Sequence, residues 1–111
     1  MIDHYSFGKI TVDGMTYTSD IKIIDNMVIQ NWWRKDGHSI CRDDVEDIID
    51  AKPDIFILGT GNFGILKVPA DFKEYLKECN IELIVEKTEK ACETFNLVKD
   101  RKVAFGAHLT C

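Results

Sequence analysis

The first third of the chain has the hydrophobic pattern of an antiparallel β-meander. Apolar and polar side chains alternate from Tyr5 to Val12, which is the period of a strand with one buried face. Asp13-Gly14 follows, and both residues tolerate the positive φ angles of a two-residue hairpin, so Met15–Thr18 is expected to return alongside. The meander continues through two short apolar runs and the turn between them: Ile21–Ile24, Asp25-Asn26 and Met27–Trp33. We expect about four strands in this region.

The rest of the chain alternates between helical and strand patterns. The first expected helix has Asp43 as its N-cap and ends at Lys52-Pro53. The second begins at Pro69 and ends at Asn80, and the third is capped by Thr88. The apolar faces of the second and third are Phe72, Tyr75, Leu76 and Cys79, then Ala91, Cys92, Phe95 and Val98. The expected strands are Ile55–Leu58 and Ile81–Val85, both as strands buried on two faces, and Lys102–Ala107.

These elements predict one compact α/β domain over residues 1–111. Strands that alternate with helices favour a largely parallel sheet, and the N-terminal meander is expected to add antiparallel strands at an edge or as a separate small layer. We therefore expect a mixed central β-sheet, with an N-terminal antiparallel meander followed by alternating helices and strands. A length of 111 residues is also that of a single domain.

Composition narrows the classes of function and the compartment. The net charge is -5 and no basic stripe is present, which argues against a nucleic-acid partner. No apolar run approaches the length of a membrane span, and the N-terminus lacks the pattern of a signal peptide. The four cysteines are therefore expected to be reduced thiols in a cytoplasmic protein with no membrane partner.

The glycine-rich loop after Ile55–Leu58 is the first candidate for chemistry. Its sequence, Gly-Thr-Gly-Asn-Phe-Gly, has the glycine spacing of the dinucleotide-binding fingerprint. That fingerprint needs a helix directly after the turn, and here Ile65–Val68 delays the helix to Pro69. The chain also lacks the second βαβ half that would hold the other nucleotide. We therefore expect no dinucleotide and no other cofactor.

Two interpretations of this loop stay open. In one, the glycines only let the chain turn sharply after a buried strand. In the other, the loop N–H groups form a shallow nest for a small anion beside the N-terminus of the third helix, on the carboxyl edge of the sheet. The ligand-binding candidates on the second interpretation are Gly59, Thr60, Gly61, Asn62, Lys67 and Thr88.

The segment Trp32-Trp33-Arg34 is the most aromatic part of the sequence. On a strand the two rings point to opposite faces, so we expect one in the core and one exposed. An exposed tryptophan beside an arginine resembles a protein-contact hot spot, and His38 follows in a loop. The partner-contact candidates are Trp32, Trp33, Arg34 and His38. The alternatives are a ring covered by Arg34, and an acid–base or loop-holding role for His38.

The end of the chain, His108-Leu-Thr-Cys111, admits three interpretations. A Cys–His pair can act as a nucleophile and its base, or two such residues can belong to a metal site. The histidines and cysteines of the chain give no metal-site spacing, and no third residue that orients His108 is evident. We therefore predict no catalytic set and no metal, and expect the tail to fold back and satisfy buried backbone groups. Asn96, within the third helix, is expected to bond backbone or to belong to a site.

Several segments in this order resemble one domain family. They are residues 5–21, 32–40, 53–69, 74–85, 87–96 and 108–111. The family comprises small archaeal and bacterial proteins, an adipogenesis-associated cytosolic protein and a mitochondrial assembly factor of respiratory complex I. The resemblance implies a three-layer α/β fold with a mixed central sheet. It implies no established enzymatic activity, and the better-studied relatives act through protein partners.

The leading hypothesis from the sequence is therefore a non-enzymatic protein-interaction or assembly domain with an unidentified protein partner. Its expected contact surface is the segment from Trp32 to His38 together with the carboxyl edge of the sheet. The alternative is a domain that binds, or an enzyme that acts on, a small anionic metabolite at the glycine loop, with Arg34 or His38 supplying charge. A homo-oligomer without a ligand is a third hypothesis.

Overall fold

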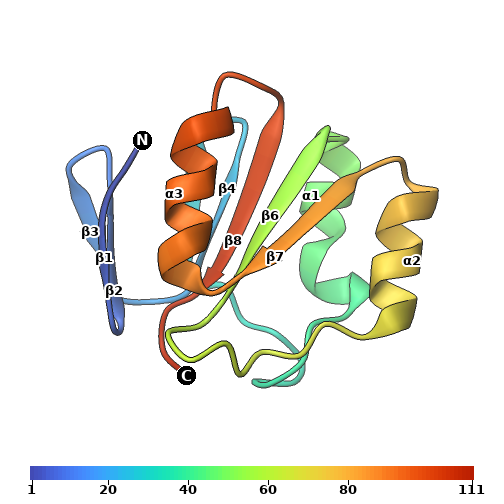
Figure 1. Ribbon diagram of the computed structural model, residues 1–111, viewed down its shortest axis with the longest axis horizontal. Helices are drawn as coiled ribbons and strands as arrows, with labels where there is room; N and C mark the ends of the chain where they lie inside the picture. The colour runs from blue at the N-terminus through green and yellow to red at the C-terminus, as the bar shows by residue number, and fades with distance from the viewer.

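The computed structural model of the protein describes every residue from Met1 to Cys111 (Figure 1). The strands are β1 (Ile2–Ser6), β2 (Lys9–Val12), β3 (Met15–Tyr17), β4 (Ile21–Ile24), β5 (Met27–Gln30), β6 (Ile55–Thr60), β7 (Glu82–Glu86) and β8 (Val103–His108). The helices are α1 (Glu46–Ala51), which follows a short 3-10 helix at Arg42–Val45, α2 (Ala70–Glu78) and α3 (Thr88–Val98). None of them has the length and apolar content that crossing a lipid bilayer requires.

The strands form two sheets, and the larger one is mixed as the sequence predicts. Strands β1, β2 and β3 make an antiparallel three-stranded sheet, and the five-stranded sheet has the order β5-β4-β8-β6-β7. Strand β6 is parallel to both β7 and β8, whereas β4 is antiparallel to β8 and β5. The carboxyl ends of β6, β7 and β8 meet at the lower edge of Figure 1, beside the C-terminus.

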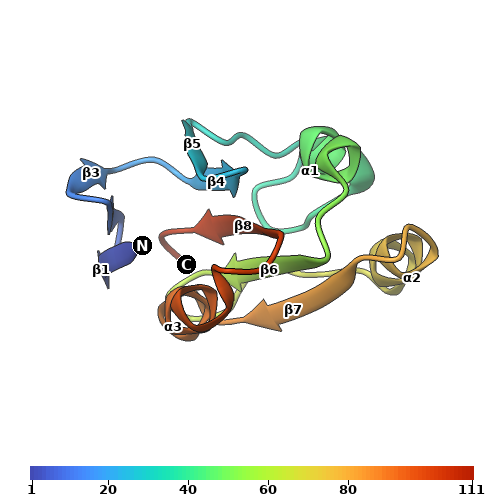
Figure 2. The ribbon, with the colours of Figure 1, turned by 90° about the horizontal axis from the view of Figure 1, so that it is seen from above.

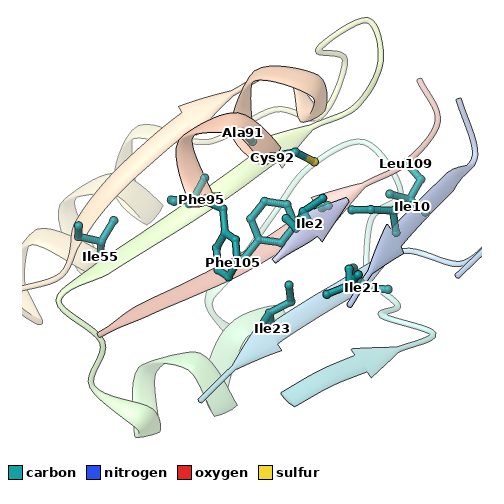
Figure 3. Packing of buried hydrophobic residues seen from close by; sticks show 13 residues of the cluster. Ile2, Ile10, Ile21, Ile23, Ile55, Ala91, Cys92, Phe95, Phe105 and Leu109 are labelled. Carbon is teal, nitrogen blue, oxygen red and sulfur yellow. The ribbon is translucent and has the colours of Figure 1, made fainter. Parts of the chain in front are cut away.

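The two faces of the large sheet carry separate cores, which gives the three layers. Helix α3 and the small sheet cover one face, and α1, α2 and the loop before them cover the other (Figure 2). In the first core, Ala91, Cys92 and Phe95 of α3 point towards the strands, and the Phe95 and Phe105 rings lie 5.4 Å apart (Figure 3). The apolar faces predicted for α2 and α3 are therefore the ones that pack.

The N-terminal meander differs from the prediction in two places. The run from Tyr5 to Val12 is broken by a turn at Gly8, whose φ is 76° and whose N–H donates to the carbonyl of Leu109 at 2.8 Å. Strand β5 ends at Gln30 because Asn31 has a φ of 58°, the left-handed region that interrupts a strand. The hairpin turn at Asp13-Gly14 is confirmed, with φ angles of 47° and 81°.

Three predictions about the later elements are wrong in detail. Strand β7 is not buried on both faces: its residues are half-buried or exposed, and it lies at the edge of the sheet with β6 as its one paired neighbour. Asp43 is exposed and is not the N-cap of the first helix; the carboxylate of Asp44 accepts from the Cys41 N–H at 2.8 Å instead. Thr88 lies within the first turn of α3, where Lys87 is the N-cap, and its hydroxyl bonds other parts of the chain.

Candidate functional site

A cavity of about 430 Å³ opens at the carboxyl edge of the sheet. Its walls come from the segment before β4, the loop after β5 and the C-terminal segment after β8. The residues that line it are Thr18, Ser19, Asp20, Asn31, Trp32, Trp33, Arg34, Gly37, His38, His108, Thr110 and Cys111. Arg34 is the only lysine or arginine among them, so the polar chemistry of this cavity centres on that residue.

Asp20, Arg34 and His108 form a hydrogen-bonded cluster in the cavity wall. One carboxylate oxygen of Asp20, Oδ2, accepts from Arg34 Nη2 at 2.9 Å and lies 2.8 Å from His108 Nδ1. The other, Oδ1, accepts from the N–H of Leu109 at 2.8 Å. The side chains are 4% exposed for Arg34 and 17% for Asp20. The cluster is therefore a largely buried ion pair with a histidine held against it.

The carboxylate of Asp20 decides which ring nitrogen of His108 carries a proton. An ionised carboxylate only accepts hydrogen bonds, so the contact at 2.8 Å requires a proton on His108 Nδ1. The 3.0 Å approach of Arg34 Nη2 to the same nitrogen is then a contact between two donors that share Asp20. Burial alone would raise the pKa of Asp20, but the hydrogen bonds from His108, Leu109 and Arg34 outweigh it and hold that pKa below its usual range.

Arg34 has more donors than the protein satisfies. Its Nε and Nη1 are buried and have no hydrogen-bond partner. One face of the guanidinium packs on Trp32, with Cζ 4.9 Å from the ring centroid. Leaving a buried donor unsatisfied costs about 1–3 kcal/mol, and more when the group is charged. A polar ligand that reached these nitrogens would recover that cost.

Backbone contacts explain why these residues meet. The register that pairs Ile21 of β4 with Ala107 of β8 places the preceding Asp20 beside the following His108. On the other side, Trp32 N–H donates to the Asp20 carbonyl at 3.0 Å, and Trp32 Nε1 donates to the carbonyl of Asp44 at 2.9 Å. The buried indole thus fixes the loop that carries Arg34.

The glycine loop lies next to the cavity, but the C-terminal segment occupies its N–H groups. Asn62 N–H donates to the Thr110 carbonyl at 2.7 Å, and the N–H groups of Phe63 and Ile65 donate to the main-chain oxygen of Cys111 at 3.1 and 3.3 Å. A Cβ at Gly61 would lie 2.5 Å from the Cys111 carbonyl carbon, so this glycine permits close contact with the tail. An open anion nest, as expected on the second interpretation, is not present in this arrangement.

The remaining ligand-binding candidates also have structural partners. The fully buried hydroxyl of Thr88 accepts from Gly61 N–H at 2.9 Å and donates to the His108 carbonyl at 2.6 Å. Thr60 donates to the carbonyl of Glu86 at 3.1 Å. A Cβ at Gly59 would lie 2.8 Å from the Thr88 hydroxyl, so a close approach of helix to strand explains that glycine. Lys67 is exposed on the loop towards α2 and lines no part of the cavity.

The four partner-contact candidates line the cavity together, but they differ in exposure. Trp32 is buried and Trp33 is 83% exposed, as expected, but both follow the end of β5 at Gln30 and the predicted strand through Trp33 is wrong. The Arg34 side chain is buried against Trp32 and therefore offers little free surface. His38 is exposed, and its N–H donates to Asp36 Oδ1 at 2.9 Å within its own loop.

The C-terminal residues make the backbone contacts that the sequence predicts, and the cysteines are unpaired. The tail folds back and satisfies backbone groups of the glycine loop, as expected. Asp20 is the residue that orients His108, which the sequence analysis did not find, and the polar partners of His108 Nδ1 are Asp20 and Arg34 rather than Cys111. All four cysteines are free thiols, and burial raises the pKa of Cys92 to about 12.

Asp20 is the functional candidate that the sequence analysis missed. It precedes a short strand in a polar stretch and has no local feature that distinguishes it from a surface carboxylate. The pairing of β4 with β8 brings His108 to it from 88 residues away, and Arg34 returns to it through the β4–β5 hairpin and the Trp32–Asp20 backbone bond. The available signal was therefore the strand register and not a sequence motif.

The fold and the cavity define a class of protein: a small three-layer α/β domain with a mixed sheet and a polar cavity at its carboxyl edge. The chain belongs to the family described as proteins of unknown function DUF498/DUF598, which matches residues 2–108.

Solved structures agree with this assignment. The protein named MT938 is 25% identical, with a TM-score of 0.83 over 100% of this chain and 98% of that chain. A conserved hypothetical protein of Pyrococcus horikoshii is 21% identical, with a TM-score of 0.82 over 100% of this chain and 99% of that one. A Mth938-like domain of Bordetella pertussis shares 13% identity, with a TM-score of 0.68 over 97% and 84% of the two chains. The fold is thus that of the Mth938-like domains.

Proposed function

We propose that this domain binds a small organic anion in the cavity beside Arg34. The observation that carries the proposal is the buried guanidinium whose Nε and Nη1 have no partner in the protein. Asp20 offsets much of the Arg34 charge, so recognition depends on the unused N–H donors, whose hydrogen bonds to an anion are stronger in a partly enclosed cavity than in water because the local dielectric constant is lower. The proposal keeps the anionic ligand of the sequence-based alternative but moves its site from the glycine loop to the adjacent cavity.

A thermal-shift screen tests the proposal. The panel contains small carboxylates, sulfonates, inorganic phosphate, phosphate esters and nucleotides. A ligand at about 100 times its dissociation constant stabilises the folded state by about 2.7 kcal/mol. In a domain of this size each kcal/mol moves the midpoint by about 4–8 °C, so a bound anion gives a clear shift.

Two variants make the screen specific for Arg34. Arg34→Gln removes the charge and most donors, and we expect it to abolish the ligand-induced shift measured from its own ligand-free midpoint. Lys35→Gln is the matched control, because Lys35 is the neighbouring cation but is exposed and pairs with Asp43. A panel that shifts neither wild type nor Lys35→Gln, or a shift that survives in Arg34→Gln, contradicts the proposal.

A second candidate function is the protein-interaction or assembly role that led the sequence analysis. It is favoured by aromatic side chains that are exposed around the C-terminal segment. Trp33 is 83% exposed, and the rings of Phe7 and Phe63 are more than half exposed with their centroids 6.3 Å apart. Tryptophan and other aromatics are enriched where proteins contact each other. The family that the sequence resembles includes a complex I assembly factor, which supports the same role.

Affinity capture from native lysate tests this second function. We expect the wild-type domain to retain a stoichiometric protein partner that Trp33→Ala loses. Leu97→Ala is the matched control, because Leu97 is also a large exposed apolar residue, at 81%, but lies on α3 away from the cavity. If wild type retains no stoichiometric partner, or if Trp33→Ala and Leu97→Ala behave alike, the interaction role does not hold.

Two other expectations remain proposals with direct tests. A homo-oligomer is tested by light scattering, and a monomer at micromolar concentration excludes it. A cytoplasmic location is tested by cell fractionation, and recovery with another compartment would contradict it.

A further inference from the structure

We infer that the anionic group taken by this cavity is the carboxylate of a small acid with a flat apolar body and one negative charge. The inference rests on the proposed function and names the ligand class for the same site. Three observations lead to it: the donors left on Arg34, the charges around them, and the exposed Trp33 ring at the cavity wall.

The donor pattern of Arg34 fits a planar acceptor. A guanidinium has two edges that each present two parallel N–H groups, Nε with Nη2 and Nη1 with Nη2. Asp20 takes a single hydrogen bond from Nη2, so it occupies one N–H and leaves one complete edge unused. A carboxylate matches such an edge with both oxygens in the same plane. Because Nε and Nη1 are covered in the free chain, binding includes a small turn of the guanidinium towards the cavity that Arg34 lines.

The charges around Arg34 fit a single negative charge. Arg34 is the only permanent cation in the cavity lining, and Asp20 in the same lining already offsets it. A dianion such as a phosphate monoester would bring two negative charges next to Asp20 with no second permanent cation. A carboxylate brings one, which costs less repulsion at the same distance.

The backbone does not supply the usual phosphate site either. Phosphates in α/β proteins are commonly held by free N–H groups of a glycine loop at a helix N-terminus. Here the N–H groups of Asn62, Phe63 and Ile65 are donated to the tail, and that of Gly61 to Thr88. The site therefore depends on the Arg34 side chain. Its fork can match either a carboxylate or a phosphate, so the single charge is what favours the carboxylate here.

The body of the ligand is inferred from the wall beside Arg34. The Trp33 ring is exposed at the cavity and provides a flat apolar surface on which a planar group can stack. The volume of about 430 Å³ lies in the lower part of the range of small-molecule sites, about 300–1,000 Å³. An aromatic or unsaturated monocarboxylate satisfies both conditions.

Four probes separate the contribution of the flat apolar body from that of the negative charge. They are benzoate, phenyl phosphate, acetate and neutral benzamide, titrated at pH 7.5, where phenyl phosphate is mostly a dianion. The readout is the ¹H–¹⁵N spectrum, in which the two tryptophan indoles of the chain and the Arg34 Nε–H give separate signals. We expect benzoate to shift the Trp33 indole and the Arg34 Nε–H, and to bind at least about tenfold more tightly than phenyl phosphate or benzamide.

Two variants test the two halves of the ligand. Arg34→Lys keeps the charge but removes the planar edge, and we expect benzoate affinity to fall about tenfold or more. Trp33→Ala changes an exposed side chain, so the fold is retained, and we expect it to reduce the preference for benzoate over acetate by about two- to tenfold. If Arg34→Lys does not fold, the Trp33→Ala variant still tests the inference.

The outcomes distinguish this inference from the proposed function. The carboxylate inference is overturned if phenyl phosphate binds as tightly as benzoate or more tightly, or if none of the panel anions that bind is a carboxylate. Either result leaves the anion-binding function in place. Benzamide binding as tightly as benzoate, or a benzoate preference unchanged in Trp33→Ala, also overturns the inference. If no anion in the panel binds, the proposed function and the inference fail together.

Discussion

Replacing Asp20 by Asn tests whether the ion pair in the cavity wall stabilises the domain as the geometry indicates. The substitution keeps the size of the side chain and one acceptor oxygen, so the Leu109 N–H can still be bonded. It removes the negative charge that lies 2.9 Å from Arg34 Nη2. The Arg34 side chain is 4% exposed and has no other acidic partner, so its charge would stay buried and unpaired.

The expected loss of stability follows from that burial. Removing one partner of a buried ion pair typically destabilises a protein by about 3–5 kcal/mol. Asp20 is 17% exposed, which places this pair near the lower end, at about 3 kcal/mol. That loss is large beside the total stability of a small domain, about 5–15 kcal/mol. Asp43→Asn is the control, because Asp43 also pairs with a cation, Lys35, which lowers its pKa. This pair is exposed to solvent, so we expect little change in stability.

The effect of Asp20→Asn has a defined pH dependence. The carboxyl of Asp20 titrates near 3.8 in the unfolded chain, and its pKa in the folded protein is lower. Its contribution to stability is therefore complete above 3.8 and is lost as the pH falls through the folded value, because the unfolded chain is protonated first. Since asparagine does not titrate, the difference between wild type and variant should be full at pH 7 and 5 and shrink below 3.8.

Urea unfolding at pH 7, 5 and 3, followed by the fluorescence of the buried Trp32, measures this difference. A loss below about 1 kcal/mol at pH 7 would show that the pair contributes little net stability, as some buried pairs do. A loss of about 3 kcal/mol that had not begun to diminish at pH 3 would refute the electrostatic explanation, since Asp20 of the unfolded wild-type chain is then mostly protonated and the advantage of the paired carboxylate is reduced.

Two further predictions concern hydrogen bonds that join distant parts of the chain. Asn96→Ala removes an amide that donates to the Ile2 carbonyl at 2.8 Å and accepts from its N–H at 2.9 Å; we expect a loss of about 1–3 kcal/mol in urea unfolding, and an unchanged midpoint would contradict it. Gly61→Ala introduces a Cβ against the Cys111 backbone at a φ of 108°, so the tail must leave the three N–H groups that donate to it. We expect amide exchange at Asn62 to accelerate at least about tenfold. Continued protection of this amide would show that the tail shifts without leaving.

The parts of the fold that the sequence predicted are those governed by local pattern. The continuous apolar run at Ile55–Leu58 became the buried strand β6, and the 3.6-residue spacing of Ala91, Cys92 and Phe95 became the packed face of α3. The same reasoning was wrong for Ile81–Val85, because an apolar run does not show how completely other elements cover the two faces of a strand. Strand order is decided by tertiary pairing, and here β8 took the position between β4 and β6 while β7 stayed at the edge.

The candidate site was only partly predictable for the same reason. Arg34 and His38 were identified because an aromatic cluster and a loop histidine are visible in the sequence. Asp20 and the role of His108 depend on the register Ile21 with Ala107, which no local pattern encodes. Thr88 was predicted to cap a helix because threonine is a common N-cap residue. Its hydroxyl instead bonds Gly61, which follows β6, and His108 of β8, and so connects α3 to both strands.

The position of β8 in the sheet has a consequence for how the domain folds. Strands β4 and β6 lie on opposite sides of β8 and do not pair with each other, so the sheet stays in two halves, β5-β4 and β6-β7, until residues 103–108 are available. During synthesis these residues emerge after all the other strands. The central sheet therefore closes in one late step, and the long sequence separations of its pairs make that step slow compared with local hairpin formation. Until then, the edges of β4 and β6 that β8 will cover are unpaired, and unpaired strand edges favour aggregation of the growing chain.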